Sequence, residues 1–239
     1  MKTKTILMAI AALIVMNLFT SCEKIKGKGA VITETRSTGN FNAISLDMQA
    51  TVYFTQDALY SVQVSGQENV LREIIVQVEG TRLVIEVKHG VILGSHEPVQ
   101  LYISAPDVEN LEVSGSGDIF TENTWAADNL SANISGSGTI NLASVNAGQL
   151  SANISGSGTI KAASGLATRE ELRISGSGTI DLRSVEANTV YTTTSGSGDT
   201  YIHALDLLDV TISGSGNIWY YGNPAINSHI SGSGNLKKM

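Results

Sequence analysis

The chain has 239 residues, enough for one substantial domain or two small ones. It contains 24 glycines and only 15% charged residues, a profile that suits an all-β protein of many short strands better than a helical protein. Its formal net charge of −7 disfavours contact with phosphate backbones, so we expect no nucleic-acid partner.

The first 21 residues have the plan of a secretory signal peptide. A basic start precedes an apolar run, residues 6–16, that is too short to span a bilayer comfortably. The only cysteine, Cys22, follows small residues, and the segment LFTSC resembles a bacterial lipobox apart from its Phe. We therefore predict that 1–21 is removed and that Cys22 becomes a lipidated N-terminus anchored in a membrane. Under the alternative, an ordinary leader, Cys22 would be an unpaired thiol.

Residues 22–29 (CEKIKGKG) show no apolar pattern, and we expect them to form a short flexible tether. The next segment, 30–113, is rich in strand-forming residues but not repetitive. Within it, 79–82 has the composition of a turn between strands, and 67–73 is compatible with one helical turn. No Pro- or Ser-rich linker precedes the first SGSG. We therefore interpret 30–113 as irregular first rungs that cap a single domain, 30–239.

From residue 114 to residue 239 the tetrapeptide SGSG occurs seven times, at steps of 18–21 residues, and such a period indicates a solenoid. Aliphatic residues recur one position before and five positions after the first Ser, as at Ile134 and Ile140, and polar residues stand between them. This alternation predicts a strand that ends at each SGSG and another that begins about two residues later. Gly tolerates the positive φ of a tight corner, so the seven copies predict seven corners stacked along one edge.

The predicted fold is therefore all-β: a single-stranded parallel β-helix, or β-solenoid, in which 114–239 forms the SGSG repeats. Parallel connections within one sheet are right-handed in nearly all cases, so we expect a right-handed coil, with a left-handed coil as the alternative.

Several motifs resemble the putative auto-transporter adhesin, head GIN domain family. They are the corner Gly138-Thr139-Ile140-Asn141, the segment FNAI (41–44) and the segment APDVENLEVSGSGDI (105–119). The resemblance covers about 40–239. It implies a β-solenoid carried by secreted lipoproteins of Gram-negative bacteria, and it implies no catalytic residue.

One predicted outward column contains the candidate binding residues. Six positions after the first Ser of each SGSG stand Phe120, Asn141, Lys161, Asp181, Tyr201, Trp219 and Lys237. We expect Tyr201 and Trp219 to stack on adjacent rungs ~4.8 Å apart, and Lys161 to pair with Asp181. Tyr220 and Tyr221 add aromatic surface nearby.

Exposed aromatic residues stack on sugars or anchor proteins, so we predict that Tyr201, Trp219, Tyr220 and Tyr221 bind a glycan or a protein. The alternative is an aromatic ladder that only shields the last rungs. In another outward column, Asn133 and Asn153 are expected to form a structural amide ladder.

The sequence predicts no catalytic residue, no metal site and no cofactor. Only two of the seven corners carry the Asp of a calcium-binding repeat, and the four histidines lack metal-ligand spacing. The best catalytic cluster is His203, Asp206 and Asp209. We therefore predict a membrane-anchored, non-catalytic lipoprotein of the cell envelope. We expect it in the outer membrane, facing the periplasm or the cell surface. The alternative is a carbohydrate-active enzyme, a polysaccharide lyase or hydrolase, on the same fold.

Overall fold

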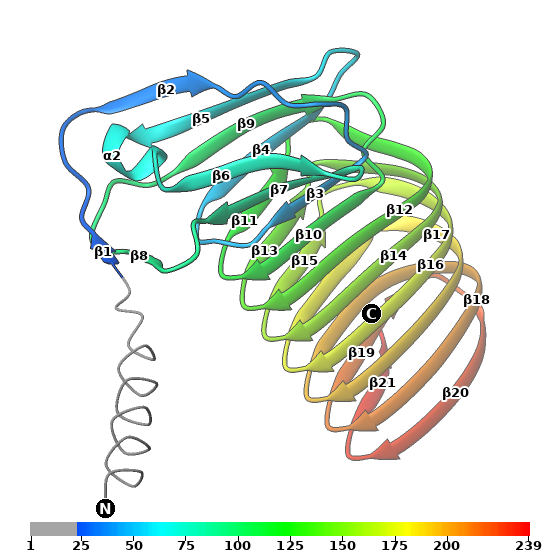
Figure 1. Ribbon diagram of the computed structural model, residues 1–239. Helices are drawn as coiled ribbons and strands as arrows, with labels where there is room; N and C mark the ends of the chain where they lie inside the picture. The colour runs from blue at the N-terminus through cyan, green and yellow to red at the C-terminus, as the bar shows by residue number, and fades with distance from the viewer. Residues whose placement is uncertain (1–22) are drawn as a thin grey trace, which may run out of the picture.

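The computed structural model describes residues 23–239, which form an all-β solenoid closed at one end by antiparallel strands (Figure 1). The expected signal peptide and Cys22 lie outside the described residues. Nineteen of the strands belong to one continuous hydrogen-bonded sheet that coils on itself, and two further strands form a small separate sheet. The predicted fold class is confirmed.

Each rung has a long arm before its SGSG corner and a short arm after it. The separate long-arm strands are β10 (Asn110–Gly115), β12 (Thr124–Gly136), β14 (Ser144–Gly156), β16 (Gly165–Gly176) and β20 (Ala225–Gly232). The separate short-arm strands are β11 (Asp118–Thr121), β13 (Thr139–Leu142), β15 (Thr159–Ala162), β19 (Asn217–Tyr221) and β21 (Asn235–Lys238). Between them, β17 (Thr179–Gly196) and β18 (Asp199–Gly214) each run through a short arm and the following long arm without a break. Every one of these strands pairs in parallel with the strand one rung away.

The SGSG copies lie directly above one another, as predicted. Ser135 is the register partner of Ser155, and Ser155 is the partner of Ser175. Where the rung shortens, the register slips between Leu182 and Glu186, in the connection between the arms rather than at the corner. The shorter spacing therefore leaves the stacked corners intact.

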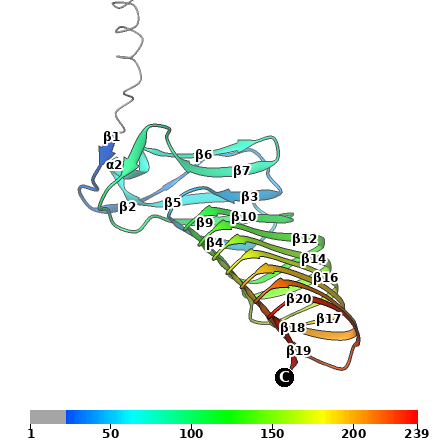
Figure 2. The same ribbon diagram turned by 90° about the horizontal axis from the view of Figure 1, so that it is seen from below.

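The segment before the first SGSG supplies further rungs and a cover for the end of the coil. Its strands and helix are β2 (Val31–Thr35), β3 (Ala43–Leu46), β4 (Thr51–Gln56), β5 (Ser61–Gln67), α2 (Glu68–Leu71), β6 (Ile74–Glu79), β7 (Arg82–Val87), β8 (Val91–Leu93) and β9 (Gln100–Ala105). Strands β3 and β4 stack in parallel on β10 and β11, and β7 and β9 stack on β3 and β4. Strands β2, β5 and β6 pair antiparallel and lie at the end of the stack opposite the C-terminus (Figure 2). The turn at 79–82 and the helical turn within 67–73 are both present.

Part of the expected tether is a strand instead. Strand β1 (Glu23–Ile25) pairs in parallel with β8, and the Gly27 amide donates to the Ser95 carbonyl at 2.9 Å. The sequence showed no apolar pattern here because these contacts are made by the backbone, and Glu23 and Lys24 remain exposed. The chain is therefore tied down from its first described residue.

The corners need glycine for two reasons. The first Gly of each SGSG has a positive φ, as at Gly156 with 127°, and a Cβ added there would collide with the carbonyl oxygen of Gly136 on the preceding rung. The second Gly packs inward, and a Cβ on Gly158 would lie 2.6 Å from Cγ2 of Ile134. Stacked corners therefore exclude any larger side chain at both positions.

The core is made of inward columns that run along the coil. The residues one position before each SGSG are at most 2% exposed, except on the last rung, where Ile230 is 41% exposed. The position five residues before SGSG is equally buried on the five middle rungs, where it is occupied by Leu130, Leu150, Glu170, Val190 and Leu208. Glu170 is therefore a carboxyl group inside an aliphatic core, with neither carboxyl oxygen in a hydrogen bond to the described residues.

Candidate functional site

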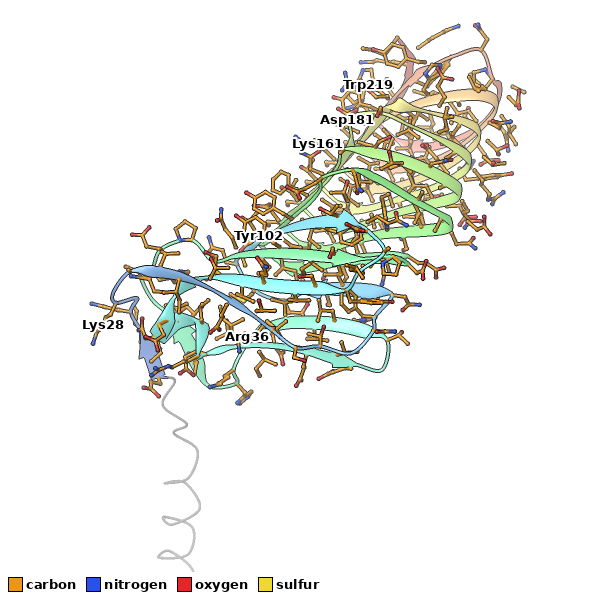
Figure 3. All side chains as sticks on the ribbon, turned by 90° about the horizontal axis from the view of Figure 1, so that it is seen from above. Lys28, Arg36, Tyr102, Lys161, Asp181 and Trp219 are labelled. Atoms are coloured by element: carbon orange, nitrogen blue, oxygen red, sulfur yellow. The ribbon has the colours of Figure 1, made fainter. Side chains whose placement is uncertain are left out.

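The outward column predicted on the short arms is present and longer than expected. Because side chains alternate along a strand, Ile140 points into the core and Asn141 points out. The register joins the predicted members and extends the column through two strands of the N-terminal segment. In spatial order it reads Tyr102, Tyr53, Phe120, Asn141, Lys161, Asp181, Tyr201, Trp219 and Lys237. Figure 3 shows Tyr102, Lys161, Asp181 and Trp219 following one another along one side of the stack.

Tyr201 and Trp219 stack as predicted, with ring centroids 4.6 Å apart and planes inclined by 6°. The guanidinium of Arg183 lies 4.2 Å from the centre of the Tyr201 ring, and the Lys237 ammonium lies 6.0 Å from the Trp219 ring. Cations attracted to ring faces thus cover both ends of this C-terminal stack. Both residues of the stack are partly exposed.

The other two predicted aromatic residues lie in different columns. Tyr220 is the register partner of the buried Ile202 and packs against the core, so it does not extend the outward surface. Tyr221 lies beside His203, with ring centroids 6.1 Å apart. The structure therefore brings Tyr201 and Trp219 together and separates Tyr220 from them.

The predicted pairing of Lys161 with Asp181 is wrong. The two residues are register partners, but the Asp181 carboxylate accepts a hydrogen bond from Nε of Arg183 at 2.8 Å. Arg183 is two residues further along the same strand and reaches Asp181 without crossing to another rung. The same guanidinium then covers the Tyr201 ring.

The amide ladder is confirmed and is longer than predicted. Nδ2 of Asn153 donates to Oδ1 of Asn133 at 2.9 Å, and Nδ2 of Asn133 donates to Oδ1 of Asn110 at 2.8 Å. The ladder links three successive rungs through their side chains.

A second aromatic stack in the outward column was missed by the sequence analysis. Tyr53 stacks on Tyr102 at 5.3 Å on one side and on Phe120 at 5.8 Å on the other. Phe120 was identified from its SGSG, but no SGSG marks the strands that carry the two tyrosines. The signal that could have found them is the similarity of TVYFT (51–55) to DIFT (118–121), the strand with which it pairs.

The structure places the three residues of the best predicted catalytic cluster, His203, Asp206 and Asp209, in different surroundings. The Asp209 carboxylate accepts a hydrogen bond from Nδ2 of Asn227 at 2.7 Å, Asp206 is exposed, and His203 packs beside Tyr221. Among residues 23–239, no three His, Cys, Asp or Glu side chains are grouped so that they could hold a metal ion. Burial raises the pKa of the Glu170 carboxyl well above its ordinary value, but this group lies inside the core.

Within the same described range, no helix is both long and apolar enough to cross a membrane.

Solved structures of bacterial proteins share this fold. The chain is 26% identical to a putative adhesin from Bacteroides fragilis, with a TM-score of 0.84, over 90% of this chain and 100% of that one. A putative lipid binding protein from Parabacteroides distasonis is 23% identical with a TM-score of 0.75, over 91% and 100% of the two chains. A putative adhesin from Parabacteroides merdae is 22% identical with a TM-score of 0.73, over 91% and 99%. No curated protein sequence matches the chain.

The sequence model of one family, described as putative auto-transporter adhesin, head GIN domain, matches residues 40–224. That match covers more than half of the chain and includes the N-terminal rungs, six of the seven SGSG corners and both aromatic stacks. The chain therefore belongs to the head GIN domain family of putative auto-transporter adhesins.

Proposed function

We propose that the protein is a lipid-anchored, non-catalytic adhesin of the bacterial cell envelope, held in the outer membrane, and that it binds a glycan or a protein through the aromatic surface around Tyr201 and Trp219. The observation that carries this proposal is the stack of Tyr201 on Trp219 on an outward sheet face. Aromatic edges and polar tips on a rigid sheet lose little conformational entropy on contact, which suits them to binding.

The direction of the coil supports this assignment. Glu23 begins β1, so an acylated Cys22 would lie beside the antiparallel cover at the N-terminal end. The rungs stack away from that end toward the C-terminus (Figure 1). A membrane anchor at Cys22 would therefore leave Tyr201 and Trp219 far from the bilayer, within reach of an external partner.

The test is a screen of the full chain, purified in detergent, against a glycan array and a set of extracellular-matrix proteins. For the ligand found, the double variant Tyr201→Ala/Trp219→Ala is expected to lose about 2 kcal/mol or more of binding free energy, as interface hot spots do. The control is Tyr191→Ala, which removes another outward tyrosine covered by an arginine, Arg169, at 4.0 Å.

The melting temperatures of the wild type and the double variant show whether the Tyr201–Trp219 stack binds a ligand or only shields the last rungs. If the stack binds a ligand, the double variant melts within a few degrees of the wild type. A large fall in melting temperature without any loss of affinity would show that the stack is an end cap, and would refute the proposal.

The alternative function, a polysaccharide lyase or hydrolase, predicts that the same purified protein cleaves polysaccharides. Release of product from a panel of polysaccharides, abolished by Asp206→Asn, would favour it over an adhesin. We expect no product, because Asp209 is hydrogen-bonded to Asn227 and His203 is packed against Tyr221.

A further inference from the structure

The N-terminal aromatic stack lies between two hollows on one sheet face. This face is formed by β4, β9 and β11, and the stack consists of Tyr102, Tyr53 and Phe120. Tyr102, at the end of the stack, is 42% exposed. Lys161 and Asp181 lie between this stack and the Tyr201–Trp219 stack, so the two stacks are separate surfaces.

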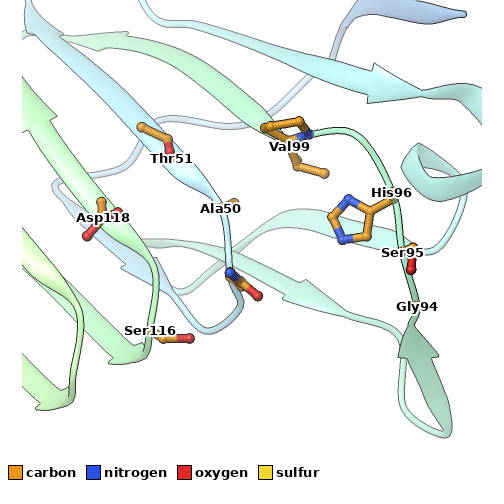
Figure 4. Close-up of a pocket in the computed structure, with 10 residues that line it drawn as sticks. Ala50, Thr51, Gly94, Ser95, His96, Val99, Ser116 and Asp118 are labelled. Carbon is orange, nitrogen blue, oxygen red and sulfur yellow. The ribbon is translucent and has the colours of Figure 1, made fainter. Parts of the chain in front are cut away.

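The first hollow has a volume of about 340 Å³ and lies between the first SGSG corner and the segment 94–99. Its polar lining residues are Gln49, Thr51, Ser95, His96, Ser116 and Asp118. Figure 4 shows the His96 ring directed from its segment toward the strand that carries Ala50 and Thr51, with Asp118 on the opposite wall. The volume falls at the lower end of the range of small-molecule sites.

The second hollow, of about 190 Å³, lies on the other side of the stack. It is lined by Tyr53 and Tyr102 themselves and by the polar residues Thr55, Ser61, Gln63, Ser104 and Glu122. The Glu122 carboxylate accepts a hydrogen bond from Oγ1 of Thr55 at 2.9 Å, which holds it on this face.

The two hollows and the stack form one continuous strip along the strands. On β11, Asp118 lines the first hollow and Phe120 belongs to the stack, and Glu122, the residue that follows β11, lines the second hollow. Alternate residues of a strand share one face. Four residues of strand span ~13 Å, so one ligand of a few rings reaches both hollows.

The hydrogen-bonding groups of the strip select for a ligand rich in donors. Nδ1 of His96 lies 2.6 Å from the carbonyl oxygen of Glu97, and because a carbonyl only accepts, Nδ1 carries the proton. In the tautomer that this contact selects, Nε2 is an acceptor, as are the carboxylate oxygens of Asp118 and Glu122. No lysine or arginine is among the described residues that line either hollow, which disfavours an anionic ligand.

We propose that this strip is a binding site for a neutral oligosaccharide, whose hydroxyl groups donate to Asp118, His96 and Glu122 while its rings cross the Tyr102–Tyr53–Phe120 stack. Sugars supply the donors that these acceptors lack and the apolar ring surface that aromatic residues contact. The site is separate from Tyr201 and Trp219, so it stands whether or not the proposal made for that stack holds.

The test is calorimetric titration of the full chain in detergent with cellotetraose, maltotetraose, xylotetraose and chitotetraose. We expect at least one to bind, and we expect Asp118→Asn and Tyr102→Ala each to weaken it roughly tenfold, the effect of losing one hydrogen bond to a charged group or one aromatic contact. Asp118→Asn keeps the shape of the side chain and Tyr102 is partly exposed, so both variants should fold. Tyr191→Ala, the matched control, should bind as the wild type does.

Three outcomes would overturn the proposal. One is that none of the four neutral oligosaccharides binds. Another is that the one that binds does so equally well in Asp118→Asn and Tyr102→Ala. The last is that tetragalacturonic acid or an arginine-rich peptide binds the strip and the neutral sugars do not, because the site would then select a charged ligand. Loss of sugar binding in Tyr201→Ala/Trp219→Ala alone would instead place the sugar on the C-terminal stack.

Discussion

At the scale of single residues, Glu170 is the side chain most at odds with its surroundings. It stands in register with Leu150 and Val190 in an inward column, and its carboxyl oxygens make no hydrogen bond to residues 23–239. Burial disfavours the charged form, so the pKa of this carboxyl is raised well above its ordinary value. At a pH between the unfolded-state and the folded-state pKa, the folded protein therefore holds a proton that the unfolded chain releases.

Because the folded and unfolded chains bind this proton with different affinity, the free energy of unfolding depends on pH, and the direction of that dependence is known. When the folded-state pKa is above the unfolded value of about 4.3, stability is full below that value and falls as the pH rises toward the folded-state pKa. We expect the free energy of unfolding to fall by up to about 1.4 kcal/mol per pH unit in that window because of Glu170. Urea titrations of wild type and Glu170→Gln between pH 5 and pH 8 measure this slope.

The comparison with a second variant separates charge from polarity. Both Glu170→Gln and Glu170→Leu should flatten the slope, but only the leucine, which matches Leu150, should also raise stability, by about 1–3 kcal/mol, because it removes an unpaired polar group. A slope unchanged in both variants would mean that Glu170 ionises without cost.

The residue scale also shows which parts of the site were predictable. Tyr201 and Trp219 each stand a fixed distance after an SGSG, so strand alternation alone placed them on one face. Tyr53 and Tyr102 have no such marker, and their places depend on pairing between distant strands. The Lys161–Asp181 pairing failed because the sequence column ignores neighbours on the same strand, and Arg183 is such a neighbour.

At the scale of the structural element, the SGSG corner was the most predictable feature. Its glycines predict a backbone with positive φ, and the regular spacing of its seven copies predicts that the corners stack. The N-terminal cover was less predictable, because its strands pair antiparallel with partners up to 43 residues away, as Ser61 with Ser104, and carry no repeat.

The corner carries its own prediction. Gly156→Ala should lower the free energy of unfolding by about 2–4 kcal/mol, because the new Cβ adds both φ strain and a collision with the carbonyl of Gly136. Gly39→Ala is the matched control, since a Cβ there meets no atom within 4 Å, and it should change stability by less than about 0.5 kcal/mol. Equal effects of the two substitutions, measured by chemical denaturation, would contradict this account of the corner.

At the scale of the whole molecule, the rungs are so similar that we expect the protein to fold after one rung is deleted. Deletion of residues 135–154 joins Ile134 to Ser155 and restores the motif ISGSGTI. We expect a folded β protein of lower stability, measured by circular dichroism and thermal unfolding, because one rung interface is lost and the others remain. Deletion of 135–153 removes one residue fewer and shifts the strand before the join by one residue. Its inward side chains would then face solvent, and its outward side chains would face the core. We expect this variant to show no cooperative unfolding.

The parallel register has one more consequence. Phe120 and Tyr201 are four rungs apart, which places the two aromatic stacks ~19 Å from each other along the coil. Gain or loss of a rung during evolution would change this separation only in whole steps of ~4.8 Å, while leaving each stack intact. The number of rungs therefore sets the distance between the two aromatic stacks, and that distance can change without any substitution in either stack.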